Sequence, residues 1–76
     1  MDIKKRKGIR ESFREYELIL FNTYTYERLK MKGAASEFWC QISTEHFTTF
    51  SEKNISEETA QIIRFLDDKK YIEVTN

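Results

Sequence analysis

The segment from Ser43 to Val74 constrains the fold of this 76-residue chain more than any other segment. Its centre carries mostly apolar residues at i, i+3, i+4 and i+7, the spacing that gives a helix one buried face: Thr59, Ile62, Ile63 and Leu66. Ser56 is a good N-cap for this helix, and Asn54 tolerates the left-handed conformation that commonly ends a preceding helix. Residues 71–74 have strand propensity. The pattern therefore predicts a helix, a turn at residues 54–56, a second helix and a strand.

This segment resembles the recognition helix and wing of winged helix-turn-helix transcription regulators. In that family a Ser precedes a Thr-Val-like pair, an apolar helix face ending in Leu, and a Gly-Tyr/Leu-Ile-x-Val strand. The matching residues are Ser56, Thr59, Ala60, Ile63, Leu66, Tyr71, Ile72 and Val74. The chain departs from the family at Lys70 and Asn54, where Gly is usual or common. The resemblance implies a mainly α fold with a small β component (α+β) that is winged helix-turn-helix-like.

The length of the chain bounds the size of its core. Seventy-six residues make one domain, and a domain of this size buries only about 60% of its unfolded surface. Six Phe, four Tyr and one Trp can supply much of the core, while the absence of Pro and the presence of only two Gly argue against a loop-rich or sandwich fold. Association into a homodimer, or with a partner, would add stability.

A single Cys excludes an intramolecular disulfide framework, which makes a reducing cytoplasm the expected compartment. The basic N-terminus is not followed by an apolar segment, so it does not have the pattern of a signal peptide. The longest aliphatic and aromatic run, residues 18–21, is too short to cross a membrane. We therefore expect a cytoplasmic protein with no membrane partner.

Charge is unevenly distributed along the chain. Residues 1–14 hold six basic side chains against two acidic ones, a net charge of +4, which leaves −4 for the remainder of a chain whose total is zero. The six are Lys4, Lys5, Arg6, Lys7, Arg10 and Arg14. Such basic segments often contact nucleic acid. The expected organisation is a flexible basic arm, residues 1–10, followed by a single winged-helix-like domain, residues 11–76.

Residues 11–32 fit two different structures. A helix from Ser12 to Gly33 would place many apolar side chains broadly on one side: Phe13, Tyr16, Leu20, Phe21, Tyr24 and Met31. As strands, alternate residues from position 16 to position 26 would face opposite sides, and the Thr-Tyr-Thr-Tyr run has strong strand propensity. We favour the helix because the downstream pattern requires a first helix. The alternative fold is a β-hairpin or sheet over residues 16–43 packed on a C-terminal helix.

Residues 38–42 are predicted to form the short strand that winged-helix domains commonly carry between their first two helices. A helix capped by Ser36 is the alternative for this segment. Thr44 is then a plausible N-cap of the helix that precedes the turn at residues 54–56, with Phe47 and Phe50 on its buried face.

The sequence offers no constellation for catalysis or metal binding. His46 is the only histidine and has no Cys or His at metal-ligand spacing. Cys40 lies in an apolar stretch, where a buried structural Cys is the common case. The acidic pair Glu57-Glu58 favours the positive end of a helix. We expect no enzymatic activity, no metal and no cofactor.

Two functions fit these features. The first is a small transcriptional or replication regulator that binds duplex DNA through its basic arm and its recognition helix. Its candidate contact residues are Lys4, Lys5, Arg6, Lys7, Arg10, Ser56, Gln61, Arg64, Lys69 and Lys70. The second is a protein-binding adaptor or inhibitor, of the phage or mobile-element type, that does not bind DNA. The adjacent acids Glu57 and Glu58 favour this second function, and Phe65, which lies off the buried helix face, suits a protein contact.

Overall fold

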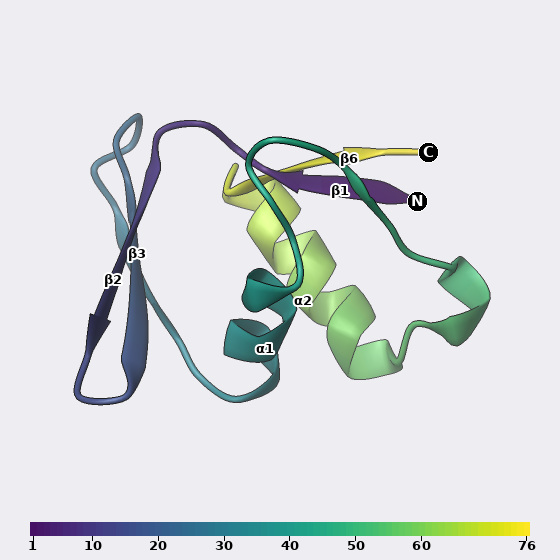
Figure 1. The fold of residues 1–76 in the computed structure, drawn as a ribbon, viewed down its shortest axis with the longest axis horizontal. Coiled ribbons are helices and arrows are strands. Elements are labelled where there is room, and N and C mark those ends of the chain that lie inside the picture. The colour runs from purple at the N-terminus through teal and green to yellow at the C-terminus, as the bar shows by residue number, and fades with distance from the viewer.

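The computed structural model describes the whole chain, residues 1–76, and contains two antiparallel sheets and two α-helices (Figure 1). One sheet has the strand order β5-β1-β6 and is formed by β1 (Asp2–Lys5), β5 (Thr48–Thr49) and β6 (Ile72–Thr75). The other is a meander with the order β2-β3-β4, formed by β2 (Ile9–Arg14), β3 (Glu17–Asn22) and β4 (Arg28–Met31). The helices are α1 (Ala34–Cys40), the short 3₁₀-helix η1 (Glu52–Asn54) and α2 (Glu57–Asp68).

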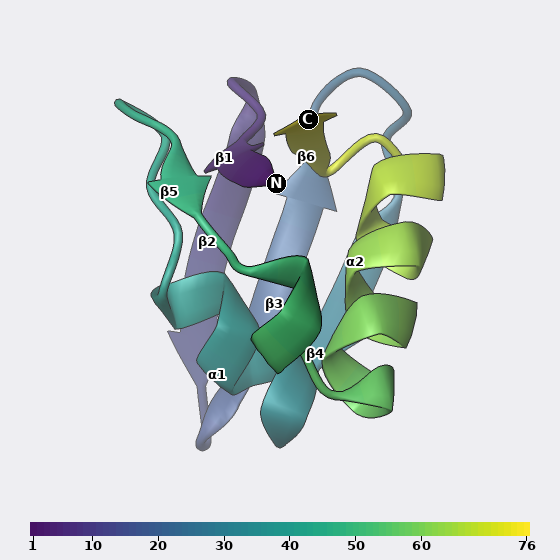
Figure 2. The same ribbon diagram turned by 90° about the vertical axis from the view of Figure 1, so that its right-hand side faces the viewer.

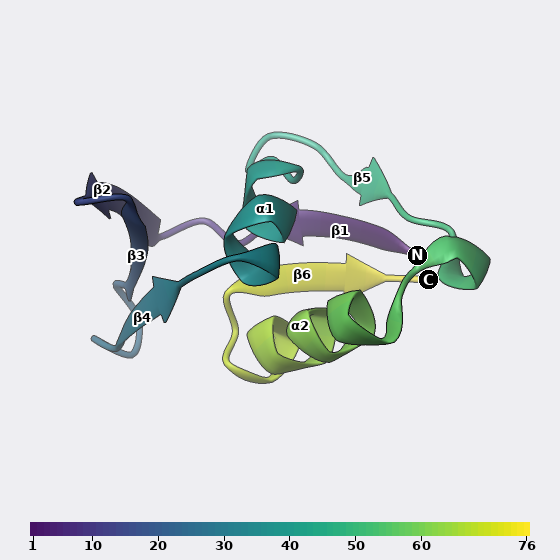
Figure 3. The ribbon, with the colours of Figure 1, turned by 90° about the horizontal axis from the view of Figure 1, so that it is seen from below.

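The meander stands at one end of the molecule, and the two chain termini lie side by side at the other end (Figures 1 and 3). Both α-helices cover the same face of the meander, as Figure 2 shows. We call this covered face the inner face. It carries Leu18, Leu20 and Asn22 of β3, all of which are buried. The opposite, outer face carries the alternate residues of the three strands, which no helix covers.

The three strands of the meander are joined by two turns that are stabilised in different ways. Arg14 pairs with Glu17, so Glu15 and Tyr16 alone connect β2 to β3, with φ angles of 50° and 69°. Two positive φ angles define a type I′ hairpin turn, which sequences usually build from Asn-Gly. The turn between β3 and β4 depends on Asn22 instead, whose side-chain Oδ1 accepts hydrogen bonds from the backbone N–H groups of Tyr24 and Thr25 at 2.9 and 3.3 Å.

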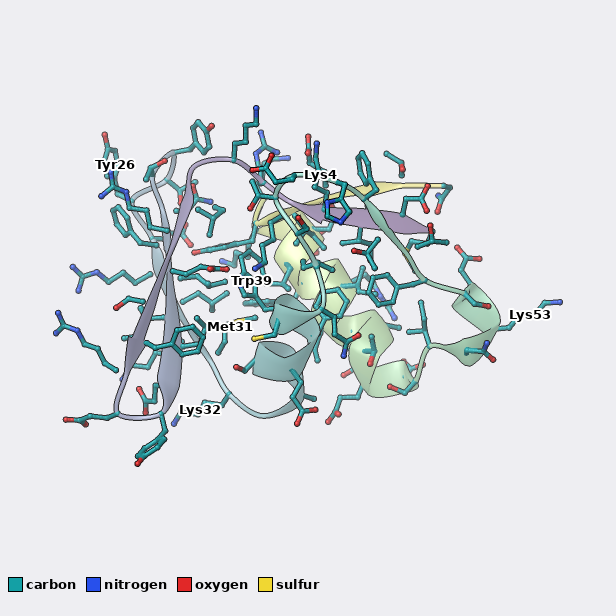
Figure 4. All side chains as sticks on the ribbon, in the orientation of Figure 1. Lys4, Tyr26, Met31, Lys32, Trp39 and Lys53 are labelled. Carbon is teal, nitrogen blue, oxygen red and sulfur yellow. The ribbon has the colours of Figure 1, made fainter.

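The core lies between the meander, the two helices and the terminal sheet. Its largest buried side chains are Trp39 of α1 and Tyr71, which precedes β6. Figure 4 shows Trp39 and Met31 in the space between the meander and the helices. The remaining core residues are Ile3, Leu18, Leu20, Phe38, Ile42, Ile63, Leu66 and Ile72.

The helix predicted after Ser56 and the strand that follows it are confirmed. Helix α2 covers residues 57–68, and the Oγ atom of Ser56 accepts a hydrogen bond from the Thr59 backbone N–H at 3.1 Å, as expected of an N-cap. Ile63 and Leu66 are the buried residues of this helix. Strand β6 then covers residues 72–75.

The predicted mainly α, winged helix-turn-helix-like fold is wrong. Strands make up 34% of the chain and helices 29%, so the α+β fold contains more sheet than a winged helix. The predicted helix over residues 12–32 is replaced by β2, β3 and β4 because the chain reverses at two turns. The predicted strand at 38–42 falls largely in α1, and β5 and η1 replace the helix expected after Thr44. The alternative fold, with sheet through residue 43, also fails beyond Met31.

Residues 1–10 do not form a separate arm in this structure. Strand β1 is the central strand of its sheet, where it pairs with both β5 and β6, and the side chain of Ile3 is completely buried. Ile9 and Arg10 begin β2. The basic cluster is therefore anchored by Ile3, whose single apolar side chain is inconspicuous among the charged residues around it.

Candidate functional site

The residues predicted to contact DNA are distributed over several surfaces. Lys4, Arg6 and Lys7 line a shallow hollow of about 350 Å³ together with Tyr24 and Glu73. Arg10 lies on the outer face of the meander, while Ser56, Gln61 and Arg64 belong to α2 or its cap, and Lys69 and Lys70 follow that helix. The helix-turn-helix that would have aligned these residues on one surface is absent.

Several of the same basic residues are engaged with acidic side chains. Four nitrogen-to-oxygen pairs lie between 2.7 and 3.9 Å: Lys4–Glu73, Lys5–Glu11, Arg64–Glu57 and Lys69–Glu27. The Lys5 and Lys4 side chains are the less exposed of the four cations, at 15% and 23% exposure, whereas Arg64 and Lys69 are largely exposed. Exposed pairs of this kind contribute at most about 1 kcal/mol each, and they offset part of the positive charge available to a phosphate.

A groove between β4 and α2 is the most apolar hollow on the molecule. It encloses about 500 Å³, and six of its nine lining residues are hydrophobic. One wall comes from β4 and α1, with Leu29, Lys30, Met31 and Ala35, and the other from α2, with Glu58, Gln61, Ile62, Phe65 and Leu66. Phe65 is 46% exposed, so its ring contributes an open apolar surface to this groove.

The strand beside the groove has a free edge, since β4 pairs only with β3. The direction in which the backbone N–H and C=O groups of β4 point follows from the pattern of hydrogen bonds between β3 and β4. The Asn22 N–H donates to the Glu27 carbonyl oxygen at 2.9 Å, and hydrogen-bonded pairs alternate along antiparallel strands. Leu29 and Met31 therefore bond to β3, whereas the N–H and C=O groups of Arg28 and Lys30 point away from the sheet.

This combination can hold an extended polypeptide segment. A segment lying along β4 would complete the hydrogen bonds of Arg28 and Lys30, as an added strand does at a sheet edge. Because side chains alternate across a strand, every second residue of that segment would enter the groove against Ile62 and Phe65. The intervening residues would lie beside the Arg28 and Lys30 side chains on the outer face. The groove would thus select the side chains of the bound segment, and the β4 edge would supply main-chain hydrogen bonds.

A polar cluster fixes α1 against both sheets and so supports one wall of the groove. Glu11 of β2 accepts hydrogen bonds from Lys5 of β1, at 2.7 Å, and from the Nε1 atom of Trp39 in α1. Burial of the Glu11 carboxyl acts to raise its pKa, but the hydrogen bonds from Lys5 and Trp39 and the Lys5 charge outweigh this, so the net pKa is lowered. Nearby, burial and then the charge of Glu27 raise the pKa of the Tyr71 hydroxyl.

Sequence reasoning identified one wall of the groove in part and missed the other. Phe65 was singled out as lying off the buried helix face, and it does line the groove. The helix favoured for residues 12–32 places Leu29, Lys30 and Met31 in the wrong kind of element, since they belong to β4. The polar-apolar alternation of residues 28–31 was the available signal, since it has the period of a strand with one covered face.

No group of three or more His, Cys, Asp or Glu side chains is arranged to hold a metal ion. Cys40, expected to be buried, is instead exposed at the end of α1. His46 is also exposed. Neither helix has the length and apolar character needed to cross a bilayer.

Comparisons with known proteins give one partial similarity. Cytochrome P450 1A1 of Limanda limanda is 40% identical over 48 residues, a match that covers 63% of this chain but 9% of the cytochrome. The chain thus spans less than a tenth of that relative, and the match does not carry over the activity of the whole cytochrome. No family model matches the chain, and no solved structure matches it.

Proposed function

We propose that this protein is a peptide-binding adaptor or inhibitor that captures an extended segment of a partner protein along β4. The observation that carries the proposal is the free edge of β4 beside the apolar groove it shares with α2. The outward N–H and C=O groups of Arg28 and Lys30 offer main-chain hydrogen bonds, which give affinity to strand addition regardless of sequence. As part of this proposal we place the protein in the cytoplasm, where its single Cys would stay reduced.

The groove defines the chemistry of the segment it would accept. Residues that enter beside Leu29 and Met31 would be apolar, because they would contact Ile62 and Phe65 on the facing helix. Residues that point to the outer face would lie next to Arg28 and Lys30, where acidic side chains form favourable cross-strand pairs. A strand with alternating apolar and acidic residues therefore fits best.

The β2 edge of the same sheet lacks this combination. Its strand is also unpaired on one side, but none of the hollows on the molecule is an apolar groove between β2 and a helix. This difference favours β4 as the edge at which a partner segment is recognised.

Selection of displayed random peptides on the immobilised chain tests the proposal. The selected peptides are then measured by fluorescence anisotropy against two neighbouring variants of α2, Phe65→Gln in the groove and Arg64→Gln outside it. Loss of a buried aromatic contact at a peptide interface should weaken binding about tenfold or more, whereas the Arg64 variant should bind as the wild type does. Equal binding by both variants, or no enrichment of alternating apolar peptides, would show that the groove is not the recognition site.

The winged-helix resemblance implies a DNA-binding regulator. It requires a recognition helix supported by a preceding helix and a turn, and β5 and η1 occupy that part of the chain.

A further inference from the structure

The outer face of the meander concentrates positive charge around an apolar centre. Three cross-strand rows follow from the register, and they contain Arg10–Phe21–Arg28, Ser12–Ile19–Lys30 and Arg14–Glu17. Lys32 reaches the last row, since its Nζ lies 3.7 Å from a Glu17 carboxylate oxygen. These five cations and one acid give the face a net charge of +4, which leaves −4 for the rest of a neutral chain. From this arrangement we infer that the outer face binds single-stranded nucleic acid.

The arginines of this face have no acidic partner. Arg10, Arg14 and Arg28 are exposed and form no ion pair, whereas Lys30 and Lys32 share Glu17 at 3.8 and 3.7 Å. An unpaired guanidinium presents a planar set of donors that matches two phosphate oxygens at once. The three arginines, placed on the two outer strands, can therefore hold phosphates on both sides of the sheet's central strand.

The central strand offers a surface for bases between these phosphate contacts. Ile19 and Phe21 of β3 are only partly buried, and they line a shallow hollow of about 630 Å³ with the surrounding cations, Ser12 and one acid, Glu11, whose carboxylate is already paired with Lys5. The ring centroid of Tyr26 lies 6.4 Å from that of Phe21, which extends the aromatic surface toward the β3–β4 turn. Figure 4 places Tyr26 and Lys32 at opposite ends of the sheet, so the aromatic and basic side chains of the outer face together extend along the length of the sheet.

This pattern favours an unpaired strand over a duplex. An exposed base can stack on an aromatic ring while its flanking phosphates meet arginines, which is how sheet surfaces bind single-stranded nucleic acids. In a duplex the bases are stacked on one another, so the apolar centre of the face would have nothing to contact. The face shares Arg28 and Lys30 with the peptide site at β4, but its other two arginines, Arg10 and Arg14, lie on β2, two strand spacings or about 10 Å away.

Fluorescence anisotropy with a labelled oligouridine of about 12 nucleotides tests the inference, since single domains cover sites of up to roughly this length. Three phosphate contacts predict that the affinity of the wild-type chain falls roughly twentyfold between about 50 and 200 mM salt. Arg10→Gln/Arg14→Gln should weaken binding about tenfold or more at low salt. The matched control, Lys53→Gln/Arg64→Gln, removes the same charge from η1 and α2 and should keep the wild-type affinity.

A second variant tests the stacking contact separately from charge. Phe21→Leu preserves an apolar side chain and should lower the affinity at least about fivefold, because base stacking on the ring is lost. Thermal unfolding of each variant establishes that the fold is retained, and the selected peptides must still bind Arg10→Gln/Arg14→Gln. No oligouridine binding at low salt, or equal losses in the arginine variant and its control, would overturn the inference. Equal affinity for a duplex or for polyglutamate would also overturn it, by showing that the face recognises negative charge alone.

Discussion

Replacing Glu11 by Ala should remove the polar link that holds α1 to both sheets. The Glu11 carboxylate lies 2.7 Å from the Lys5 Nζ, accepts the Trp39 indole N–H, and is 38% exposed. The substitution leaves the N–H of a buried Trp39 side chain without its partner, which costs about 1–3 kcal/mol. The lost ion pair adds no more than about 1 kcal/mol, because solvent screens the carboxylate. A total of roughly 2 kcal/mol lowers the melting temperature of a domain this small by about 8–16 °C.

The matched control for this prediction is Glu73→Ala. Glu73 also pairs with a lysine of β1, Lys4, at 3.5 Å, but its side chain is 46% exposed and forms no bond to a buried group. Its loss should change the unfolding free energy by less than about 0.5 kcal/mol in urea titrations. Equal destabilisation by the two substitutions would refute the reasoning.

The pH dependence of the Glu11 effect gives an independent check. The folded-state pKa of Glu11 is lowered, so the unfolded chain binds the proton more readily. The stability that this group contributes is therefore present above the unfolded pKa and is lost as the pH falls through the folded pKa. The difference in unfolding free energy between the wild type and Glu11→Ala should shrink in acid, and a constant difference from neutral to acid pH would contradict this account.

Three further predictions test the local structure. Leu66→Ala should cost about 2–5 kcal/mol in urea titrations because Leu66 is fully buried, whereas Phe65→Ala should cost clearly less, and equal costs would place both in the core. Glu15→Asn combined with Tyr16→Gly should raise stability by about 1–2 kcal/mol, since both positions have positive φ, and a lower melting temperature would argue against the type I′ turn. Ser56→Ala should cost about 0.5–2 kcal/mol in the same titrations through the lost N-cap, and an unchanged midpoint would argue against that cap.

The part of the fold that could be predicted from sequence is the part specified by local signals. In α2 the N-cap Ser56 and the buried positions Ile63 and Leu66 all indicate the same helix. The strand that follows is also marked locally, by the Tyr-Ile-Glu-Val run. Because neighbouring residues favour the same secondary structure, this segment can be predicted without knowledge of its packing.

The meander and α1 depend on features that local patterns hide. The β2–β3 turn uses Glu15 and Tyr16, which carry none of the usual Asn or Gly signal, so the chain reversal was invisible. Helix α1 begins after Gly33, although a Gly at this position also suits the end of a preceding helix. The helix buries Phe38 and Trp39, whose side chains also suit a strand. In both segments tertiary packing overrides local propensity.

The candidate site was only partly predictable because its two walls lie far apart in the sequence. The exposed position of Phe65 could be inferred from helical spacing, but its pairing with Leu29 and Met31 requires that β4 pack beside α2. The outer-face arginines were likewise separated between a supposed arm and a supposed helix. Only the register of β2, β3 and β4 places Arg10 and Arg28 in one row with Phe21.

The measurement that tests the central claim most directly is amide hydrogen exchange, resolved by residue, with and without a selected peptide. The N–H groups of Arg28 and Lys30 point away from the sheet, so they should exchange rapidly in the free chain and become protected when a strand is added. The N–H groups of Glu11 and Phe13 at the β2 edge serve as internal controls and should not change. Protection confined to Arg28 and Lys30 would support strand addition at β4. Peptide binding that leaves both amides in rapid exchange would contradict it.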